Sequence, residues 1–560
     1  MRTFRALVVD DDTDLLDIAL ESAAPERGIH VSVGRNLDEA DALIADHYFN
    51  VAFVDIELDR TARPNVDGLT ILRLLADVRP SCRRLLLTGR PSEYRAGIFD
   101  MLDPANRVID GAIDKENFDH LFVDYVEVAA LEWLRAPVDV GALELLYEQL
   151  QGRLIRGGMT PGGRRVATTL EEVDYVVSSA FGQDIERDAD EGKAVDDIAA
   201  IDLELLEGGK SRSIVAYGRP RTSAEEDGIQ CVVKIGPRHD TLEELRRYDR
   251  YVRFRLSLHR RVELLGHAVG DTLGAICYSF AGSSPRDIVA LQSLFNAQDE
   301  RAHATIQQLL GDKSDWRVGG PRARDLAGFF RHAYRLDALK VIAEADAFST
   351  RRAASFGATK SGSALVFPGG GRVELPVDAD LVAGNVRGFY DQSVVHGDLN
   401  ASNVIVSSTN EIVLIDFRHT ERGPVTLDLA GLEASLRLTP QVWADVGEHA
   451  IRDLAIERKL WAHDFSESDD WWSGGPDAEP PYWARVSATL MGIAIRTMSV
   501  SRRQHAVTCL LYALRVFRVT QLDPAARMRL LVWTAAIKET LARLPKERRP
   551  AAAAAEEPAA

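Results

Sequence analysis

The sequence VVHGDLNASN at residues 394–403, followed by IDF at residues 415–417, carries the most specific chemistry in this chain. An apolar stretch leads into a loop with Asp398, Asn403 follows five residues later, and a second apolar stretch ends at Asp416. One carboxylate can orient a hydroxyl and accept its proton, while an amide oxygen and a second carboxylate can hold Mg²⁺ on phosphate oxygens. The segment therefore predicts Mg²⁺-dependent phosphoryl transfer, with Asp398 as catalytic base and Asn403 and Asp416 as metal ligands.

Length and composition limit the remaining possibilities. A chain of 560 residues is too long for one hydrophobic core, so we expect about two to four domains. With 46% hydrophobic and 27% charged residues, the composition is that of globular protein. The net charge of −18 argues against a protein that neutralises nucleic-acid phosphates, so no nucleic-acid partner is expected.

The cysteines and the apolar runs indicate the compartment. The four cysteines have no CxxC or zinc-like spacing, which suits a reducing cytosol. The N-terminus passes directly into a short apolar strand and an acidic cluster, without the apolar core of a signal peptide. No apolar run is long enough to span a bilayer. We therefore expect a cytoplasmic protein with no membrane partner.

Residues 5 to about 125 alternate short apolar runs with amphipathic stretches, which predicts a doubly wound parallel sheet of five strands covered by helices. The expected strands are residues 6–9, 30–33, 51–54, 84–87 and 108–113. Functional groups of such a sheet collect beyond the carboxyl ends of the strands. The polar residues at those positions are Asp10, Asp11, Asp55, Thr88 and Lys115. Because three carboxylates on one rim repel one another, they are predicted to hold a divalent cation.

This pattern resembles the receiver domain of two-component response regulators over nearly all of residues 3–125. The resemblance implies that Asp10 and Asp11 bind Mg²⁺ together with Asp55, the phosphoacceptor. It also implies switch roles for Thr88 and Lys115, and a sensor histidine kinase or another phosphodonor as partner.

Two departures from the receiver pattern are visible. The segment from Asp55 to Gly68 is longer than the family's usual spacing, and Glu116 stands where a proline usually follows the lysine. The longer segment borders the predicted metal site, so phosphorylation kinetics or partner fit can differ from the family's. The alternative is a degenerate receiver whose carboxylates only cap strand ends.

Residues 126–200 are predicted to form a helical linker or small module of unknown role. From residue 201 the pattern becomes strand-rich, with a glycine-containing turn at Gly209 and an apolar strand that ends in Lys234. Two strands joined by such a turn and followed by a lysine-ending strand suggest a nucleotide-covering hairpin and a phosphate-binding lysine. Glu243 or Glu244 on the next helix can pair with this lysine, and Glu244 is assigned to the nucleotide site. A Walker A loop is disfavoured because Glu204 occupies the position of its first glycine.

The HGD and IDF motifs resemble the protein-kinase superfamily, in particular its aminoglycoside and choline phosphotransferase branch, over roughly residues 201–440. The resemblance implies ATP and Mg²⁺ as cofactors, a bracing role for His396 and a structural role for Asp428. The glycine that usually follows the aspartate–phenylalanine pair is Arg418 here, which disfavours a flipping switch. A pseudokinase that binds nucleotide or nothing is the alternative.

A more specific resemblance is to a kinase-like ternary-complex-associated domain of bacterial multi-component signalling systems. It rests on VVKIGPR at residues 232–238 and on the Glu-x-x-x-Tyr pattern at residues 244–248. If it holds, effector proteins in an assembly are further partners.

The predicted architecture is multidomain: an α/β receiver, then an α+β bilobal kinase-like domain with a mainly helical C-terminal part. The expected divisions are a receiver at 1–125, the linker at 126–200, a small lobe at 201–281, a large lobe at 282–545 and a disordered tail at 546–560. The leading hypothesis is a receiver that regulates a kinase-like phosphotransferase. The alternative is a signalling scaffold built on a nucleotide-binding pseudokinase.

Overall fold

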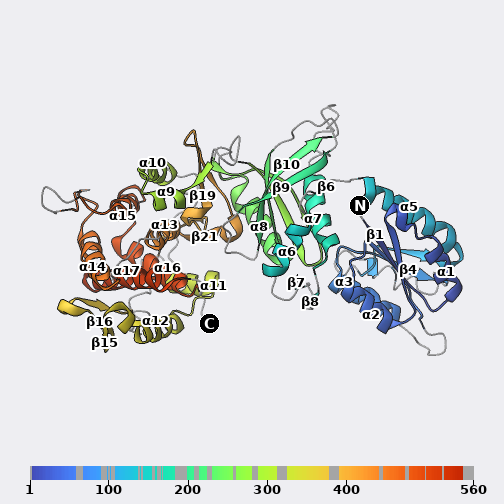
Figure 1. Cartoon of the computed structure of the whole chain (residues 1–560), viewed down its shortest axis with the longest axis horizontal. Helices are drawn as coiled ribbons and strands as arrows, with labels where there is room; N and C mark the ends of the chain where they lie inside the picture. Colours follow the sequence, from blue (N-terminus) through green and yellow to red (C-terminus); the bar gives the residue numbers. More distant parts are fainter. Residues whose placement is uncertain are drawn as a thin grey trace, which may run out of the picture. The chain divides into compact units, whose positions relative to one another are not determined.

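The computed structural model of the chain divides into two compact units (Figure 1). The first unit comprises residues 1–245 and 263–283, and the second comprises residues 246–262 and 284–560. The structure describes residues 3–58, 67–89, 98, 101–102, 108–135, 139–140, 143–153, 158–159, 165–166, 168–182, 198–206, 213–222, 230–256, 260–280, 288–311, 325–376, 390–439, 446–468, 470–472, 479–498, 500–519 and 522–545. Gly209 and the tail at 546–560 lie outside these residues.

The N-terminal domain is a five-stranded parallel sheet with the strand order β2-β1-β3-β4-β5. Its strands are β1 (Phe4–Val9), β2 (Ile29–Gly34), β3 (Val51–Asp55), β4 (Arg83–Thr88) and β5 (Gly111–Asp114). Its main helices are α1 (Thr13–Glu21), α2 (Leu37–Asp46), α3 (Asp67–Val78) and α5 (Phe118–Arg135). This is the doubly wound order 2-1-3-4-5, which confirms the predicted α/β fold.

The alternation of side chains along β1 explains the two helical layers. Phe4, Ala6 and Val8 are buried on the side covered by α1 and α5, and Leu7 and Val9 are buried under α2 and α3. Because neighbouring residues of a strand point to opposite faces, a strand that is apolar throughout needs cover on both faces. The continuous apolar runs of this domain therefore require helices on both sides of the sheet.

The fifth strand begins later than its apolar run. The prediction placed it at residues 108–113, but β5 starts at Gly111. The amides of Val108 and Ile109 both donate to the carbonyl of Met101, at 2.9 and 3.3 Å, so they are not available to the ladder with β4. Within the predicted run only Ile109 is buried, and Ala112 of β5 is exposed. The turn hydrogen bonds set where the strand begins.

A second sheet of the first unit has six strands in the order β12-β13-β11-β10-β9-β6. These are β6 (Asp139–Val140), β9 (Ile198–Leu205), β10 (Ile214–Thr222), β11 (Cys231–Pro237), β12 (Leu264–Val269) and β13 (Leu273–Ser279). The helices α6 (Leu143–Arg153) and α7 (Leu170–Gly182) contribute Leu146, Val173 and Val177 to the same core as Ile201 and Val233. The segment predicted as a linker thus supplies part of the core beneath this sheet. A short hairpin of β7 (Gly158–Met159) and β8 (Arg165–Val166) lies between the two helices in sequence, and α8 (Arg238–Arg247) follows β11.

The second unit is mainly helical. Its short strands are β14 (Ile288–Ala290), β15 (Thr359–Ser361), β16 (Ala364–Val366), β17 (Arg372–Glu374), β18 (Gln392–Val395), β19 (Val404–Ser407), β20 (Ile412–Leu414) and β21 (Glu421–Pro424). Its helices are α9 (Leu291–Ala297), α10 (Arg301–Ile306), α11 (Leu326–Tyr334), α12 (Ala338–Arg352), α13 (Leu427–Leu438), α14 (Val446–Ala462), α15 (Tyr482–Gly492), α16 (Arg502–Phe517) and α17 (Pro524–Arg543). The predicted cap of α17 is present, since Asp523 accepts from the amide of Ala526 and Pro524 is the first helical residue.

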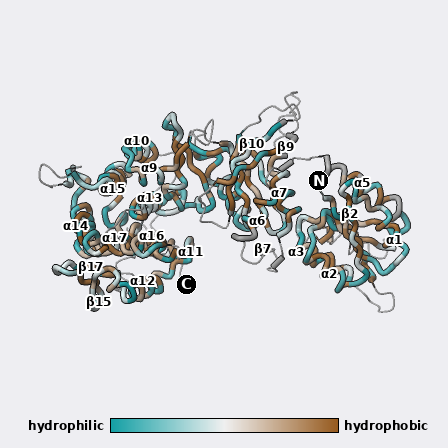
Figure 2. Tube along the Cα trace, in the orientation of Figure 1, coloured by the Kyte–Doolittle hydropathy of each residue, from teal (hydrophilic) through white to brown (hydrophobic). Residues whose placement is uncertain are grey.

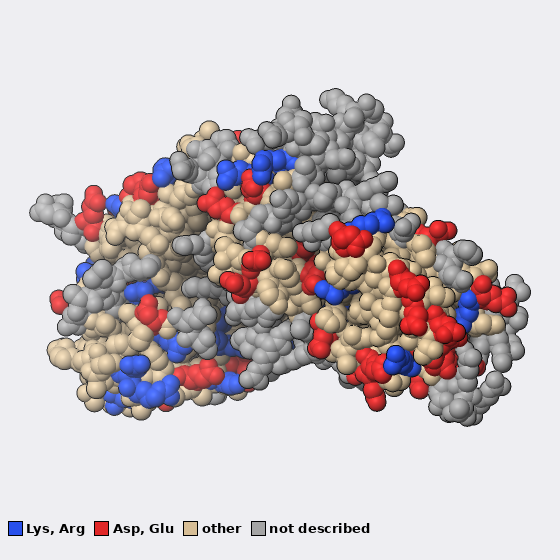
Figure 3. Space-filling view, turned by 45° about the vertical axis from the view of Figure 1, so that its right-hand side comes forward, with Lys and Arg blue, Asp and Glu red and all other residues tan. Residues whose placement is uncertain are grey.

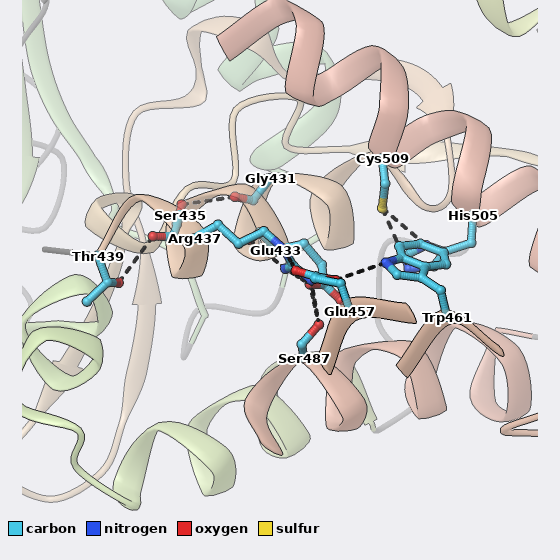
Figure 4. Close-up of polar contacts among 10 residues, drawn as sticks. All are labelled: Gly431, Glu433, Ser435, Arg437, Thr439, Glu457, Trp461, Ser487, His505 and Cys509. Carbon is cyan, nitrogen blue, oxygen red and sulfur yellow. Dashed lines mark hydrogen bonds and ion pairs between the residues drawn. The ribbon is translucent and has the colours of Figure 1, made fainter. Parts of the chain in front are cut away.

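A buried ionic cluster lies within this helical core (Figure 4). Arg437 of α13 donates to both carboxylate oxygens of Glu457, at 2.7 and 3.0 Å, and also to Glu433 one turn earlier. Ser487 of α15 donates to Glu433 at 2.6 Å, and the guanidinium lies 4.4 Å from the ring centroid of Trp533. Because the side chains of the cluster come from four helices, the cluster connects α13, α14, α15 and α17.

The distribution of apolar and charged residues follows these layers. Hydrophobic residues concentrate on the strands of the N-terminal domain and along α16 and α17 (Figure 2). Acidic side chains gather on the face of the N-terminal domain drawn in Figure 3. Among the described residues, no helix is long and apolar enough to cross a membrane.

Candidate functional site

Three carboxylates meet at the carboxyl edge of the N-terminal sheet. Asp10 follows β1, Asp11 comes next, and Asp55 ends β3, and each offers an oxygen within 4.8 Å of the others. The ammonium of Lys115 lies 2.7 Å from an oxygen of Asp10 and 2.7 Å from Oδ2 of Asp55. Hard divalent cations prefer carboxylate oxygens, so this donor set fits Mg²⁺. The strand order therefore brings together four of the five residues that the sequence singled out at this edge.

Burial and charge act in opposite directions on these groups. Burial raises the pKa of Asp55 to about 6, against the lowering effect of the Lys115 ammonium. Burial likewise raises the pKa of Asp10. Burial opposes the charged form of Lys115, but the two carboxylates outweigh it and raise the pKa of the ammonium. The carboxylates at this edge repel one another, and a bound cation would reduce that repulsion.

The surrounding backbone fixes Asp55. Thr88 is buried at the end of β4, one residue beyond Leu87, which is the register partner of Asp55. Gly68, at the start of α3, approaches so closely that a Cβ there would lie 1.8 Å from the carbonyl oxygen of Asp55. The start of α3 therefore packs directly against the backbone of Asp55.

In the second unit, the loop at residues 396–403 connects β18 to β19 and is held by Asp428 and by the buried His396. Asp428, in the first turn of α13, accepts from the amides of His396 and Gly397 at 2.9 and 3.0 Å. Nε2 of His396 lies 2.8 Å from the carbonyl oxygen of Ile415, just before Asp416. Burial raises the pKa of Asp428, and the two backbone amides that it binds oppose this rise without cancelling it. The two apolar segments of the motif are thereby tied to one helix and to each other.

Asn403 immediately precedes β19, and Asp416 lies two residues after β20, the strand that pairs with β19. The side-chain nitrogen Nδ2 of Asn403 donates to the backbone carbonyl oxygen of Asp398 at 2.9 Å. The side-chain oxygen of Asn403 takes no part in this bond. The backbone amide of Ile415 donates to the carbonyl oxygen of Asn403 at 3.1 Å. Asp416 has a left-handed backbone with φ of 64°, a strained conformation that is concentrated at functional sites. An amide oxygen and a carboxylate held in this way suit a hard cation.

Asp398 has partners that the sequence did not reveal. Nη2 of Arg515, on α16, lies 2.7 Å from its Oδ1, and Nη1 lies 3.2 Å from the carbonyl oxygen of Gly397. The hydroxyl of Tyr334 donates to the same carbonyl at 2.7 Å. Arg515 is more than a hundred residues from Asp398 in sequence. The apolar spacing around it predicts a helix but does not predict what the arginine contacts. The local signal that could have indicated this contact was a charged residue, Arg515, within the mainly apolar stretch at residues 506–517.

Lys234 forms a separate pair in the first unit. Its ammonium lies 2.6 Å from Oε2 of Glu244, and the hydroxyl of Tyr278 donates to the other oxygen of Glu244 at 3.0 Å. Glu244 is almost completely buried, so its partners hold it in one position. Of the two glutamates considered from the sequence, Glu244 is the one bonded to this lysine. This pair belongs to the first unit, whereas Asp398, Asn403 and Asp416 belong to the second.

Within the first unit, the N-terminal domain is joined to the six-stranded sheet by a buried polar junction. Arg79 follows α3, and its guanidinium lies 3.5 Å from Asp271 in the β12–β13 turn, with both side chains fully buried. The amide and hydroxyl of Ser81 also donate to Asp271, at 3.0 and 2.5 Å. Glu172 of α7 accepts from the amides of Thr272 and Leu273 in the same turn, at 2.5 and 2.9 Å.

Part of the chain is similar to known families. A family model described as ternary complex associated domain 9 matches residues 348–511, which include the HGD loop and most of α16. This match lies C-terminal to residues 232–248, on which the sequence resemblance to such a domain was based. No curated protein matches the chain.

Solved response-regulator structures are similar to the N-terminal part. A CheY-like receiver domain protein from Methanospirillum hungatei is 25% identical over 23% of this chain and 95% of its own, with a TM-score of 0.20. The response regulator TrrA from Thermotoga maritima, in complex with Mg²⁺ and BeF, is 24% identical over 23% of this chain and 99% of its own, with a TM-score of 0.18. A complex of the histidine kinase ThkA with TrrA matches at 25% identity over 23% of this chain and 98% of that chain, with a TM-score of 0.18.

Proposed function

We propose that this chain is a two-component-type signalling protein. Two features of its N-terminal domain support this proposal: the receiver-like fold and an acidic sheet edge that suits Mg²⁺. In this proposal, phosphorylation of Asp55 regulates an ATP- and Mg²⁺-dependent kinase-like phosphotransferase. The observation that carries the proposal is the convergence of Asp10, Asp11, Asp55 and Lys115 on one sheet edge.

At the receiver edge, an oxygen of Asp55 would attack the phosphorus of a phosphodonor such as a phosphohistidine of a sensor kinase. As the new O–P bond forms, the P–N bond breaks and its electron pair leaves with the imidazole, which takes up a proton. Asp10 and Asp11 would hold Mg²⁺, which supplies charge neutralisation for the phosphoryl oxygens when bound. Lys115 already contacts Asp55 and can bind an oxygen of the aspartyl phosphate. Thr88, buried at the end of β4, is the hydroxyl nearest in the strand register to bind another.

In the kinase-like part, Asp398 orients the acceptor hydroxyl and takes its proton, and Asn403 and Asp416 would hold Mg²⁺ on the phosphates of ATP. Lys234, paired with Glu244, would bind the α and β phosphates. His396 and Asp428 keep the loop in place through the hydrogen bonds described above.

The polar junction offers a route for regulation. Arg79 and Ser81 lie between α3 and β4 of the receiver, and both bind Asp271 of the six-stranded sheet that carries Lys234. A change of the receiver that altered this contact would bias the sheet between two arrangements, as regulation by population shift requires.

A scaffold without catalytic activity is the second candidate. Two observations favour it: residues 348–511 match a ternary complex associated domain, and Oδ1 of Asp398 is already occupied by Arg515. In that case the kinase-like part would be a nucleotide-dependent platform for partner proteins.

Two experiments test the proposal. Acetyl phosphate with Mg²⁺ should label the wild-type chain and not Asp55→Ala; labelling that survives the substitution would remove Asp55 as acceptor. Labelled ATP with Mg²⁺ should give phosphotransfer or ADP that is lost in Asp398→Ala and in Asp416→Ala. Retained ATP binding without turnover in the wild type, across a broad panel of acceptors, would support the scaffold instead.

A further inference from the structure

The guanidinium of Arg515 is aimed at the catalytic loop from the far C-terminal part of the chain. It contacts one oxygen of Asp398 at 2.7 Å and the carbonyl oxygen of Gly397 at 3.2 Å. The side chain is only 18% exposed, so it cannot swing freely into solvent. A charge-assisted bond of this length between partly buried groups fixes the carboxylate more firmly than a surface pair does.

The two oxygens of Asp398 differ in their surroundings. Oδ1 receives Arg515 at 2.7 Å and the hydroxyl of Tyr512 at 3.4 Å. Among the described residues, the contact of Oδ2 is with the side-chain amide of Asn400, at the long distance of 3.4 Å. Asp398 is 26% exposed at its side chain. Oδ1 therefore has the shorter, charge-assisted contact, whereas Oδ2 has a single long contact among the described residues.

Arg515 is itself held by aromatic rings. Its guanidinium carbon lies 4.0 Å from the ring centroid of Tyr334 and 5.0 Å from that of Tyr512. Tyr334 in turn donates to the carbonyl oxygen of Gly397. Cation–π contacts of this kind restrain the plane of the guanidinium, so helices α11 and α16 both contribute to its direction.

We propose that Arg515 is a positioning residue for Asp398, holding Oδ1 so that Oδ2 faces the acceptor hydroxyl. This inference rests on the proposed phosphotransfer. In that step, the acceptor oxygen forms a bond to the γ-phosphorus, the bond from that phosphorus to the β,γ-bridging oxygen breaks, and its electron pair leaves with ADP. The hydroxyl proton passes to Oδ2 of Asp398. Arg515 touches none of the reacting atoms and acts only through the carboxylate.

The test measures ADP formation by the full-length chain from ATP and Mg²⁺, with water as the acceptor probe. Arg515→Met should lower kcat about 10- to 100-fold, the scale expected for misplacing a reacting group by about 1 Å, with KM for ATP within about twofold of wild type. Arg515→Lys keeps the charge and should recover part of kcat. Arg518→Met, an exposed arginine at the end of the same helix, should leave both constants unchanged.

A second arm separates positioning from a merely structural role. In an Asp398→Asn background, Arg515→Met should cause no further loss of kcat, because the group it positions no longer accepts the proton. Wild-type kcat in Arg515→Met, a further loss in the double variant, or a higher kcat in Arg515→Met would each overturn the inference. The last result would mean that Arg515 masks Asp398.

The failure of the proposed function has a different signature. If the wild-type chain forms no ADP and binds ATP normally, phosphotransfer fails and the positioning role fails with it. If the wild type forms ADP and the Arg515 variants do so equally well, only the positioning role is lost.

Discussion

Arg79 and Asp271 form an ion pair, 3.5 Å long, in which neither side chain is exposed to solvent. The two residues are 192 positions apart in sequence, one after α3 of the N-terminal domain and the other in the β12–β13 turn. Ser81 supplies two further donors to the same carboxylate. A buried charge remains stable only when it is paired and hydrogen-bonded, so this contact is where the two sheets of the first unit depend on each other.

Removing the arginine should destabilise the first unit strongly. Arg79→Met leaves Asp271 buried without its main partner, and breaking such a pair costs about 3–5 kcal/mol. Denaturant unfolding followed by hydrogen exchange of the β12–β13 turn would measure this loss. Arg5→Met is the matched control, because its pair with Glu171 also joins the receiver to α7 but is 24% and 28% exposed. That variant should change stability by less than about 1 kcal/mol; equal effects in the two variants would contradict the role given to the buried pair.

The same junction predicts a pH dependence. Burial raises the pKa of Glu172 from its ordinary 4.5 to about 7, although the amides of Thr272 and Leu273 oppose the shift. A carboxyl whose pKa is raised by folding stabilises the folded state below its unfolded pKa, and this contribution is lost as pH rises from 4.5 to 7. Thermal unfolding of the first unit should therefore occur at a lower temperature at pH 8 than at pH 5.

Glu172→Gln tests that assignment. The amide can keep the hydrogen bonds to the turn without ionising, so the variant should be more stable than wild type above pH 7, by on the order of 1–3 kcal/mol. The slope of the unfolding temperature between pH 4.5 and 7 should flatten. An unchanged slope would assign the titration to Asp271, whose pKa is also raised by burial.

Alanine substitutions at two glycines distinguish the cost of backbone strain from the cost of a steric clash. One of the two glycines, Gly397, lies in the HGD loop. Gly397 has φ of 80°, and a Cβ there would lie 2.1 Å from the carbonyl oxygen of His419. Gly362 has φ of 56° with nothing within 4 Å of such a Cβ. Gly362→Ala should therefore cost only the left-handed strain, about 1–2 kcal/mol.

Gly397→Ala should cost more, because the loop must also move away from His419 and would break the amide bond to Asp428. Thermal unfolding of the second unit measures both variants, and limited proteolysis near residue 400 should accelerate only in Gly397→Ala. Equal losses of stability would show that the close approach to His419 is unimportant.

The ionic cluster of the helical unit gives a further test. Arg437→Met removes the guanidinium that pairs with two buried carboxylates, Glu433 and Glu457, and should destabilise the second unit by about 3–5 kcal/mol. Arg458→Met, in α14, is the control, since its pair with Glu539 is 45% and 23% exposed and should contribute less than about 1 kcal/mol. Calorimetry of the full chain measures both. A small effect of Arg437→Met would mean that water or neighbouring donors replace the guanidinium.

Local sequence was sufficient for the receiver edge. Asp10, Asp55 and Lys115 each follow a recognisable apolar strand, and the rule that carboxyl ends of parallel strands share one edge places them together. The start of β5 could not be predicted in this way, because the hydrogen bonds of Val108 and Ile109 to Met101 depend on the path of the preceding turn.

The sequence by itself determined the two loops that carry Asp55 and Asp398, because strand, turn and polar residue are contiguous there and their chemistry is local. Only the tertiary structure decided what those carboxylates contact. Arg515 reaches Asp398 from a helix more than a hundred residues away, and Arg79 reaches Asp271 across two sheets. A buried charge is stable only when an opposite charge or hydrogen-bond partner lies beside it. Which residue lies there depends on how distant elements pack together.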